Sequence, residues 1–381
     1  MAVRVAFLEL GTHQNNLYVF SKVATTGNDD VTVFTTESIA RAVREELGAE
    51  ASAVTWVEKG DDESLRAYLR RVEGYCEQID VLIVQPLYGG YRKLFTYATF
   101  DPPCDRALTV FNARLWLEAS YSLGHWPLHN LNTALRRRIV DAFDALVVEY
   151  PPIADYVTSL GVGTPVYTLS PTLFEDDQCI PDGPVRFTVP GFIEPDRRDY
   201  DIVLDVFADL FEQFDDEVEL QILGTPKGEY GERILNRCDE FTDAGHSVVT
   251  YREWIPLDEF ETGLRRSHFL LCPLRRTIAK GPVEERYGTT KGSGNVFDAI
   301  RTATPLIVPA HFAVADGMAD ATVAYDNRND LYDSLETLVC DRDRRMTLYD
   351  QALETARAYT RERQHERFSR VVAGVSDRET N

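Results

Sequence analysis

The sequence predicts an α/β fold of two Rossmann-like, doubly wound domains that face a central cleft. Short apolar runs such as residues 3–8, 81–84 and 145–148 alternate with amphipathic segments along the whole chain. That alternation is typical of parallel strands buried on both faces and joined by helices. The pattern restarts after residues 170–183, an acidic segment with two prolines that we interpret as a linker.

The first half reads as six strands connected in part by helices. Residues 36–47, for example, place Ile39, Ala40, Val43 and Leu47 on one helical face. The predicted strands are residues 3–8, 31–35, 81–84, 107–111, 145–148 and 165–169, and the predicted helices are residues 36–47, 64–78 and 136–143.

The second half repeats the plan. Its predicted strands are residues 185–189, 218–223, 247–251, 268–273 and 305–309, and its predicted helices are residues 201–214, 229–241, 257–266, 330–340 and 346 to about 372. Ligands of doubly wound folds bind at the carboxyl ends of the strands, so we expect the loops there to carry function.

Charge and composition exclude several classes of protein. The formal net charge is −22, which repels nucleic acid, so we expect no nucleic-acid partner. Only six of the 40 basic residues are lysine. Acidic, lysine-poor chains are typical of salt-loving organisms, in which salt screens the self-repulsion; an acidic mesophilic protein is the alternative.

The location of the protein follows from three features of the sequence. No apolar run is long enough to span a bilayer, and the start of the chain reads as a strand instead of a signal peptide. The six cysteines are scattered without a CxxC pair, which favours a reducing cytoplasm over disulfides or a zinc site. Residues 134–148 carry Arg136, Arg137 and Arg138, so a peripheral contact with the inner face of a membrane competes with an ordinary basic surface helix.

Residues 268–309 organise the functional interpretation. An apolar run is followed by a basic loop, then by Lys291, Gly292, Ser293 and Gly294, an amphipathic segment and a second apolar run. This order indicates a strand, a glycine-rich loop, a helix and a strand. A glycine-rich loop before a helix N-terminus is a common binding site for phosphate. Ser293 is also a candidate N-cap, which is compatible with phosphate binding.

With these motifs the chain resembles the GT-B glycosyltransferases, and within them the large retaining family that uses nucleotide-sugar donors (glycosyl transferases group 1). The motifs are Pro190-Gly191-Phe192 with Arg197-Arg198, a strand ending in Gly224, the segment around Trp254-Ile255, and Lys291 to Ile300. The resemblance implies an acceptor-binding domain at residues 1–170, a donor-binding domain at 171–345, and a helix at 346–381 that packs back toward the first domain.

The resemblance also implies roles for individual residues. The donor site would comprise Gly191, Arg197, Arg198, Gly224, Trp254, Ile255, Lys291, Gly292, Ser293, Gly294, Asn295 and Asp298. Asp298 would contact a ribose hydroxyl; the alternative is that its side chain is a solvated charge on the helix surface. Trp254 would lie against the base, and a core tryptophan is equally compatible with the sequence.

Chemistry supports this assignment independently. Sugar transfer from a nucleotide diphosphate builds negative charge on the departing phosphate, which cations and helix amides stabilise. Arg198 (or Arg197) and Lys291 are the cations that we expect to act, at about 1.5–3 kcal/mol for each charge-assisted hydrogen bond. Such a pair replaces a metal ion, so we expect no metal and no cofactor beyond the nucleotide sugar itself.

Two positions depart from the family pattern. The family has two glutamates separated by seven residues, where this chain has Thr290 and Asp298, and Glu284 and Glu285 lie nearby at the wrong spacing. It often has a histidine at the end of a strand in the first domain, where this chain has Phe111.

Other polar side chains of the first half could take the place of that histidine. Asn112 and His125 are the candidates, and we place His125 among the catalytic residues with Arg198 and Lys291. The acceptor site is predicted at Gly11, Thr12, His13 and Asn112.

Three functions are compatible with the sequence. The first is a glycosyltransferase acting on a glycan, lipid-linked or protein acceptor. The second is a GT-B-like protein that binds a nucleotide sugar or glycan without catalysis, as the changes at Thr290 and Phe111 suggest. The third is another GT-B enzyme such as a sugar-nucleotide epimerase. Donor turnover distinguishes the first from the second.

Overall fold

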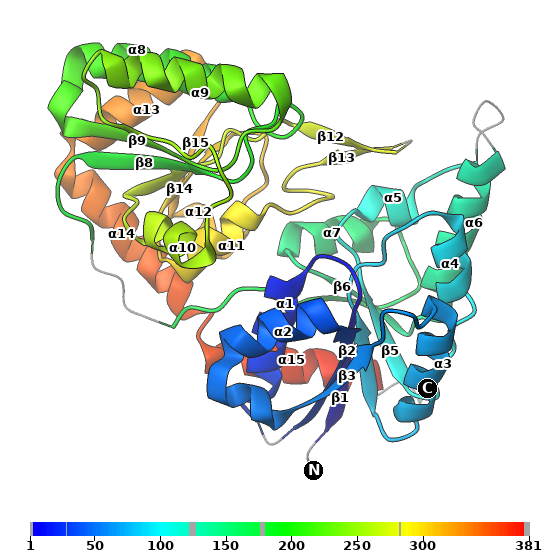
Figure 1. The fold of residues 1–381 in the computed structure, drawn as a ribbon. Coiled ribbons are helices and arrows are strands. Elements are labelled where there is room, and N and C mark those ends of the chain that lie inside the picture. The colour runs from blue at the N-terminus through cyan, green and yellow to red at the C-terminus, as the bar shows by residue number, and fades with distance from the viewer. Residues whose placement is uncertain (1–2, 28, 122–126, 176–179, 282, 377–381) are drawn as a thin grey trace. The chain divides into compact units, whose positions relative to one another are not determined.

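A computed structural model describes residues 3–27, 29–121, 127–175, 180–281 and 283–376. Internal contacts divide the chain into two units. The first domain comprises Met1–Leu173, Ala279–Glu285 and Arg361–Asn381, and the second comprises Phe174–Ile278 and Arg286–Thr360. Each has its own sheet and core (Figure 1).

The first domain is built on a parallel sheet of seven strands in the order β3-β2-β1-β4-β5-β6-β7. The central strands are apolar along their whole length because helices cover both faces. The strands are β1 (Arg4–Glu9), β2 (Asp30–Thr36), β3 (Val54–Lys59), β4 (Val81–Val84), β5 (Asp105–Thr109), β6 (Ala145–Val148) and β7 (Val166–Thr168).

Its helices cover the two faces of that sheet. The helices are α1 (Gln14–Ala24), α2 (Glu37–Leu47), α3 (Leu65–Cys76), α4 (Tyr91–Tyr97), α5 (Ala113–Leu117), α6 (Pro127–Ala142), α7 (Pro151–Ser159) and α15 (Arg361–Ser376), with a short 3₁₀ turn at Gly48–Ala53. α1, α2 and α15 share one core with the strands, in which Phe7 packs against Phe20 and Phe368. The C-terminal helix is therefore part of the first domain.

The second domain has a parallel sheet of six strands in the order β10-β9-β8-β11-β14-β15. Its strands are β8 (Val185–Pro190), β9 (Val218–Leu223), β10 (Val248–Val249), β11 (Phe269–Leu271), β14 (Leu306–Pro309) and β15 (Thr322–Tyr325). A separate two-stranded sheet is formed by β12 (Thr277–Lys280) and β13 (Val283–Arg286), and the segment Ala279–Glu285 within it belongs to the first domain.

The helices of this domain lie on both sides of its sheet: α8, α9 and α13 on one, and α10, α11, α12 and α14 on the other (Figure 1). They are α8 (Tyr200–Phe214), α9 (Gly228–Asp243), α10 (Leu257–Arg265), α11 (Gly294–Arg301), α12 (Asp316–Ala319), α13 (Arg328–Cys340) and α14 (Arg342–Arg357), with a 3₁₀ turn at Asp215–Glu217.

The prediction of one long last helix was wrong. Residues 342–376 form two helices, α14 and α15, separated at Ala358–Thr360. The interruption has no glycine or proline to mark it. It is fixed by a tertiary contact, because the N–H of Phe174 donates to the carbonyl of Tyr359 at 3.1 Å. The boundary between the two domains falls at the same place, between Thr360 and Arg361.

The fold class predicted from the sequence is confirmed: both halves are doubly wound, Rossmann-like domains. The strand order reverses between β1 and β4 in the first sheet, and between β8 and β11 in the second. Ligands of such sheets bind at the carboxyl ends of the strands beside this reversal. The central cleft stays a prediction. Among the described residues, no helix is both long and apolar enough to cross a bilayer.

Candidate functional site

In the second domain, the loops after β8 and β9 meet through two glycines. Gly191 has φ +99°, and its N–H donates to the carbonyl of Leu223 at 2.9 Å. A Cβ atom on Gly224 would lie 1.9 Å from the carbonyl oxygen of Gly191, so only glycine fits there. The two predicted glycines therefore bring these loops together beside the strand reversal.

Arg198 lies against the first of these glycines. Its side chain is 7% exposed, and its Nη2 and Nη1 donate to Asn295 Oδ1 at 3.0 Å and to the Phe192 carbonyl at 3.3 Å. A Cβ atom on Gly191 would lie 2.5 Å from Nη2, so the glycine also makes room for the guanidinium. These partners are neutral oxygens, and Nε has no hydrogen-bond partner among the described residues. The positive charge is therefore available to an anion.

The neighbouring Arg197 is in a different environment. Its Nε lies 2.7 Å from Glu194 Oε1, and its side chain is 40% exposed. An exposed ion pair of this kind contributes little to stability. The sequence could not separate the two arginines, and the structure favours Arg198 as the candidate for anion binding.

The start of α11 is tied to the same place. Ser293 is the N-cap residue by position, but its hydroxyl lies 3.1 Å from Asn295 Oδ1 and makes no capping bond to the helix backbone. Asn295 is 3% exposed and donates from Nδ2 to the Pro190 carbonyl at 3.1 Å. The buried amide of Asn295 therefore bridges β8 and Arg198.

The N-terminal end of α11 is itself accessible. Gly294, its first residue, is exposed. The first amides of a helix have no acceptor within the helix, and they carry the positive end of its dipole. The structure thus brings Gly191, Gly224, Arg198, Ser293, Gly294 and Asn295 together at one end of the second sheet.

Lys291 and Gly292 lie in a tight turn just before this helix. The N–H of Lys291 donates to the Arg286 carbonyl at 3.1 Å, and its carbonyl accepts from Gly288 at 2.8 Å. The Lys291 side chain is partly exposed, while Gly292 is buried. Thr290, where the family has a glutamate, is fully buried, and its hydroxyl accepts from the Arg286 N–H at 2.7 Å. Thr290 therefore holds the turn that carries Lys291.

Asp298 is held by a neighbouring arginine. Its Oδ1 accepts from Arg301 Nη2 at 3.0 Å, and Arg301 also pairs with Glu261. The Asp298 side chain is only 18% exposed, so the alternative of a freely solvated helix charge is wrong. Burial raises the pKa of Asp298, while Arg301 opposes that rise. Its contact with a ribose stays a prediction.

An exposed aromatic surface lies next to the loop after β8. Trp254 is 74% exposed, so the alternative of a core tryptophan is wrong, whereas Ile255 is buried. The rings of Trp254 and Phe192 are 6.1 Å apart, and Lys227 Nζ lies 4.0 Å from the Phe192 ring centroid. Sequence reasoning missed Phe192 and Lys227 as site residues, although each closely follows a predicted strand.

In the first domain, a carboxylate stands at the end of the central strand. Glu9 is the last residue of β1 and is 1% exposed. Its Oε1 accepts from the backbone N–H of Gly11. Burial raises the pKa of Glu9 to about 7, and the backbone N–H groups of Gly11 and His13 act in the opposite direction. Sequence reasoning missed Glu9, although a glutamate directly after an apolar strand is itself a signal.

His13 lies between this carboxylate and a tyrosine. His13 Nδ1 is 3.7 Å from Glu9 Oε2, and His13 Nε2 is 3.0 Å from the Tyr88 hydroxyl. The imidazole stacks on the Tyr88 ring at 5.3 Å and meets the edge of Phe111 at 4.8 Å. Phe111, which stands where the family that the sequence resembles often has a histidine, thus packs against another histidine.

Several buried polar atoms lie at the same end of the first sheet. They are the Gln85 amide, directly after β4, and the Thr109 hydroxyl and Asn112 Oδ1, at and just after the end of β5, the strand beyond β4. Among the described residues none of these atoms has a hydrogen-bond partner. Buried polar groups without partners are costly and mark places where water or a ligand binds. Of the predicted acceptor residues, His13, Gly11 and Asn112 lie in this group, and Thr12 is exposed beside it.

His125, which we predicted to be a catalytic residue, lies outside the described residues. The basic cluster of α6 faces protein groups: Arg136 lies 6.0 Å from the Trp116 ring, Arg137 lies 4.9 Å from the Tyr121 ring, and Arg138 donates to the Ala98 carbonyl at 3.2 Å. Contact with a membrane stays a prediction.

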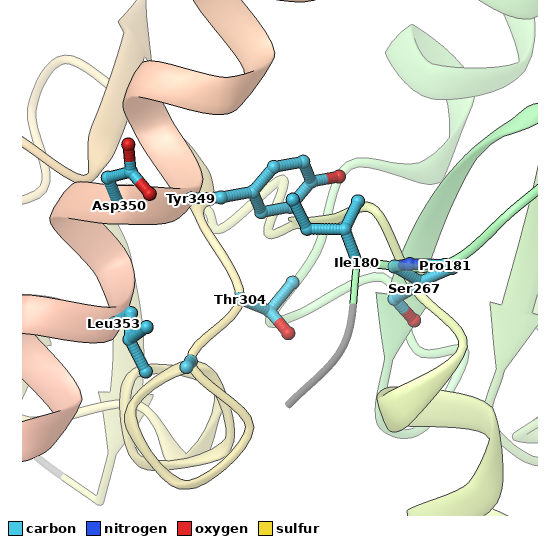
Figure 2. Close-up of a pocket in the computed structure, with 8 residues that line it drawn as sticks. Ile180, Pro181, Ser267, Thr304, Tyr349, Asp350 and Leu353 are labelled. Carbon is cyan, nitrogen blue, oxygen red and sulfur yellow. The ribbon is translucent and has the colours of Figure 1, made fainter. Parts of the chain in front are cut away.

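A cavity of about 110 Å³ lies elsewhere in the second domain, and Figure 2 shows the residues that line it. Its lining residues are Ile180, Pro181, Ser267, Ala303, Thr304, Tyr349, Asp350 and Leu353. Ser267 and Thr304 precede β11 and β14, so this cavity is at the amino ends of the strands. It contains none of the predicted site residues and lies at the opposite end of the sheet from Arg198.

Comparison with solved structures shows the same fold over nearly the whole chain. HepE of Anabaena, crystallised in complex with UDP and glucose, has a TM-score of 0.64 at 11% identity, covering 97% of this chain and 99% of that one. An α,α-trehalose-phosphate synthase (UDP-forming) from Burkholderia vietnamiensis has a TM-score of 0.60 at 10% identity and covers both chains fully. TarM of S. aureus, with UDP among its ligands, has a TM-score of 0.54 at 12% identity over 80% of this chain and 59% of that one.

Sequence comparison adds nothing to this likeness. No family model matches the chain, and no curated protein sequence matches it. At 10 to 12% identity the structural likeness shows the fold alone, two Rossmann-like domains of the GT-B class. The activity has to be argued from the residues of this chain.

Proposed function

We propose that this protein is a glycosyltransferase that moves a sugar from a nucleotide-sugar donor to a hydroxyl acceptor. The observation that carries the proposal is the convergence of Arg198, Asn295 and the start of α11 on the Gly191–Gly224 contact. It combines a buried cation and helix amides at the place where doubly wound sheets bind nucleotides. The shared fold with HepE and the trehalose-phosphate synthase, whose descriptions name UDP, makes UDP the first nucleotide to test.

The donor diphosphate is assigned to the start of α11. Its backbone amides and the Arg198 guanidinium stabilise the charge that develops on the departing phosphate, and Lys291 adds a second cation from the turn before the helix. Both cations come from the protein, so the proposed transfer requires no metal ion. Trp254 offers an exposed ring to the base, and Asp298 is the candidate for the ribose.

The acceptor is assigned to the first domain, next to Gly11, His13 and Asn112. We place the reaction in the cytoplasm, because the six cysteines are scattered without a CxxC pair. We place it in a salt-adapted cell, because the chain is acidic and poor in lysine. Retention of the sugar's configuration, which the sequence resemblance implies, would require the departing phosphate to take the acceptor's proton.

A binding protein without catalysis is the second candidate. It is favoured by Thr290, whose hydroxyl is used inside the turn instead of contacting a donor sugar. Calorimetry with UDP, GDP, ADP and dTDP in high salt, followed by donor hydrolysis with the matching nucleotide sugars, separates the candidates. Binding with turnover supports the transferase, binding without turnover supports the second candidate, and no nucleotide binding refutes both.

A further inference from the structure

Two thiols meet at the amino end of the first sheet, the end opposite to Glu9 and His13. Cys76 is the last residue of α3 and is fully buried, and Cys104 directly precedes β5 and is partly exposed. The proposed transfer uses neither of them. They are far apart in the sequence, so only the fold brings them together.

The backbone places the two cysteines beside each other. β4 and β5 begin in register, and the N–H of Asp105, the first residue of β5, donates to the Asp80 carbonyl at 3.2 Å. The N–H of Ile79 donates to the Cys76 carbonyl at 3.2 Å, in the turn that leads from α3 into β4. Cys76 and Cys104 therefore precede two neighbouring strands at the same edge of the sheet.

The loop before Cys104 is also attached to α3. The N–H of Asp101 donates at 2.9 Å to Oε1 of Glu73, which lies one turn before Cys76 in the helix. Asp101 forms an ion pair with Arg106 at 2.9 Å, and two prolines between Asp101 and Cys104 restrict the backbone. Contacts on both sides of Cys104 thus fix its position.

The two side chains are in contact as well. The Cys76 thiol donates a hydrogen bond to the Cys104 sulfur, and this bond, together with burial, raises the pKa of Cys76 above its usual value. Cys76 therefore keeps its proton at neutral pH. Cys104 is the thiol that a dissolved oxidant can reach, because it is the partly exposed member of the pair.

A pair of neighbouring thiols suits either a disulfide or a metal ion. Stable metal sites usually have three or four protein ligands. Within the ranges that the structure describes, no group of three His, Cys, Asp or Glu side chains could hold a metal. The pair therefore favours a disulfide, which requires the two sulfur atoms to close from hydrogen-bond contact to about 2.05 Å.

We propose that Cys76 and Cys104 form a reversible disulfide, a redox-sensitive modification site of the first domain. The inference does not rest on the proposed function. It agrees with a reducing cytoplasm, where such bonds are transient and act in redox sensing, so that the pair is normally held as two thiols. The cross-link closes a loop that contains β4, α4 and Tyr88, whose ring stacks on His13.

The oxidant is a hydroperoxide, and the reaction balances in two steps. Cys104 attacks the peroxide, the O–O bond breaks, and the thiol proton leaves with the departing oxygen as alcohol or water, which gives a sulfenic acid on Cys104. The Cys76 sulfur then displaces the hydroxyl of that sulfenic acid, which leaves as water with the Cys76 proton. The two thiols lose two electrons to the peroxide, and an added dithiol reverses the reaction.

The first test is peptide mapping of the full chain after treatment with hydrogen peroxide in high salt. Trypsin separates the two cysteines, because Arg92 and Lys93 lie between them. We expect a cross-linked peptide pair that lacks two hydrogen atoms, forms within one chain and is released by dithiothreitol. Cys340→Ser, which changes an exposed cysteine at the end of α13, is the control and should form the same bond at the wild-type rate.

Cys104→Ser must abolish this cross-link. It should keep the fold because its side chain is partly exposed, so it decides the matter even where a change at buried Cys76 prevents folding. Absence of the bond in the wild type, or a bond from either cysteine to another cysteine or to a second chain, overturns the proposal.

The second test concerns the order of the two steps. In Cys76→Ser, the sulfenic acid on Cys104 has no thiol to displace it, so dimedone should label Cys104 about tenfold more than in the wild type. In Cys104→Ser, Cys76 should stay reduced because it is buried. Equal labelling of Cys104 in the wild type and in folded Cys76→Ser would contradict the assigned roles, since Cys76 would then not resolve the intermediate.

Discussion

The guanidinium of Arg198 donates a hydrogen bond of 3.0 Å to the side-chain oxygen of Asn295, the second residue of α11. The amide nitrogen of Asn295 in turn donates to the carbonyl of Pro190, at the end of β8. One amide side chain therefore couples the buried cation to both the strand and the helix that form the proposed phosphate site. This relationship, more than any single residue, distinguishes Arg198 from the other arginines of the chain.

Arg198→Ala should weaken UDP binding about 10- to 100-fold in calorimetry, because it removes charge-assisted hydrogen bonds of about 1.5–3 kcal/mol from the site. Arg197→Ala is the matched control, since Arg197 forms an exposed ion pair with Glu194. We expect that control to change affinity less than threefold. Equal losses in the two variants would show that only the overall basic charge matters.

Lys291→Ala should weaken nucleotide diphosphate binding at least tenfold. The turn that carries it is held by backbone bonds and by the Thr290 hydroxyl, so it should keep its shape when the side chain is shortened. The affinity of Lys227→Ala should be measured beside it, because Lys227 is a second lysine of this domain and its ammonium group lies over the Phe192 ring. Unchanged affinity of Lys291→Ala, measured by calorimetry, would remove Lys291 from the site.

Gly224→Ala should damage both folding and binding. The new Cβ atom would lie 1.9 Å from the backbone oxygen of Gly191, and neither loop has a flexible side chain there that could move aside. We expect a loss of at least a few kcal/mol in urea unfolding of the second domain and no measurable UDP binding. Gly317→Ala, whose Cβ atom would meet nothing within 4 Å, should behave like the wild type. Normal UDP affinity of Gly224→Ala would show that the two loops can separate at no cost.

Much of the fold could be predicted because its central strands are buried on both faces. β4 and β6 are uninterrupted apolar runs, and short runs of this kind between helices predict buried parallel strands. Edge elements lack this signal: β3 is half exposed, and β12 and β13 carry lysine, glutamate and arginine. Their pairing is decided by neighbouring strands, which a single sequence does not reveal.

The proposed donor site was more predictable than the buried group of Glu9 and His13 for a physical reason. Gly191 and Gly224 are required by close approach of the guanidinium of Arg198 and of the backbone, and that requirement leaves a mark in the sequence, whereas a Cβ atom on Gly294 would meet nothing within 4 Å. Glu9 differs from other carboxylates because it is buried and because His13, four residues later in the chain, lies beside it in the folded protein. A carboxylate after a strand reads as an ordinary loop residue until its exposure is known.

The burial of Glu9 also predicts a particular dependence of stability on pH. Its pKa is about 7 in the folded protein and 4.5 without the fold, so between these values the folded state holds more protons than the unfolded state. Stability contributed by this group therefore falls as pH rises from 4.5 to 7, by a total of about 3 kcal/mol.

Glu9→Gln should remove that dependence, since glutamine keeps the shape and cannot ionise. We expect the variant to be more stable than the wild type at pH 8, by up to about 3 kcal/mol in urea unfolding of the first domain, and nearly equal to it at pH 4.5. Glu37→Gln on α2, where the side chain is 58% exposed, should show no such difference. A Glu9→Gln variant that is destabilised at pH 8 would mean that the ionised carboxylate contributes to folding instead of costing stability.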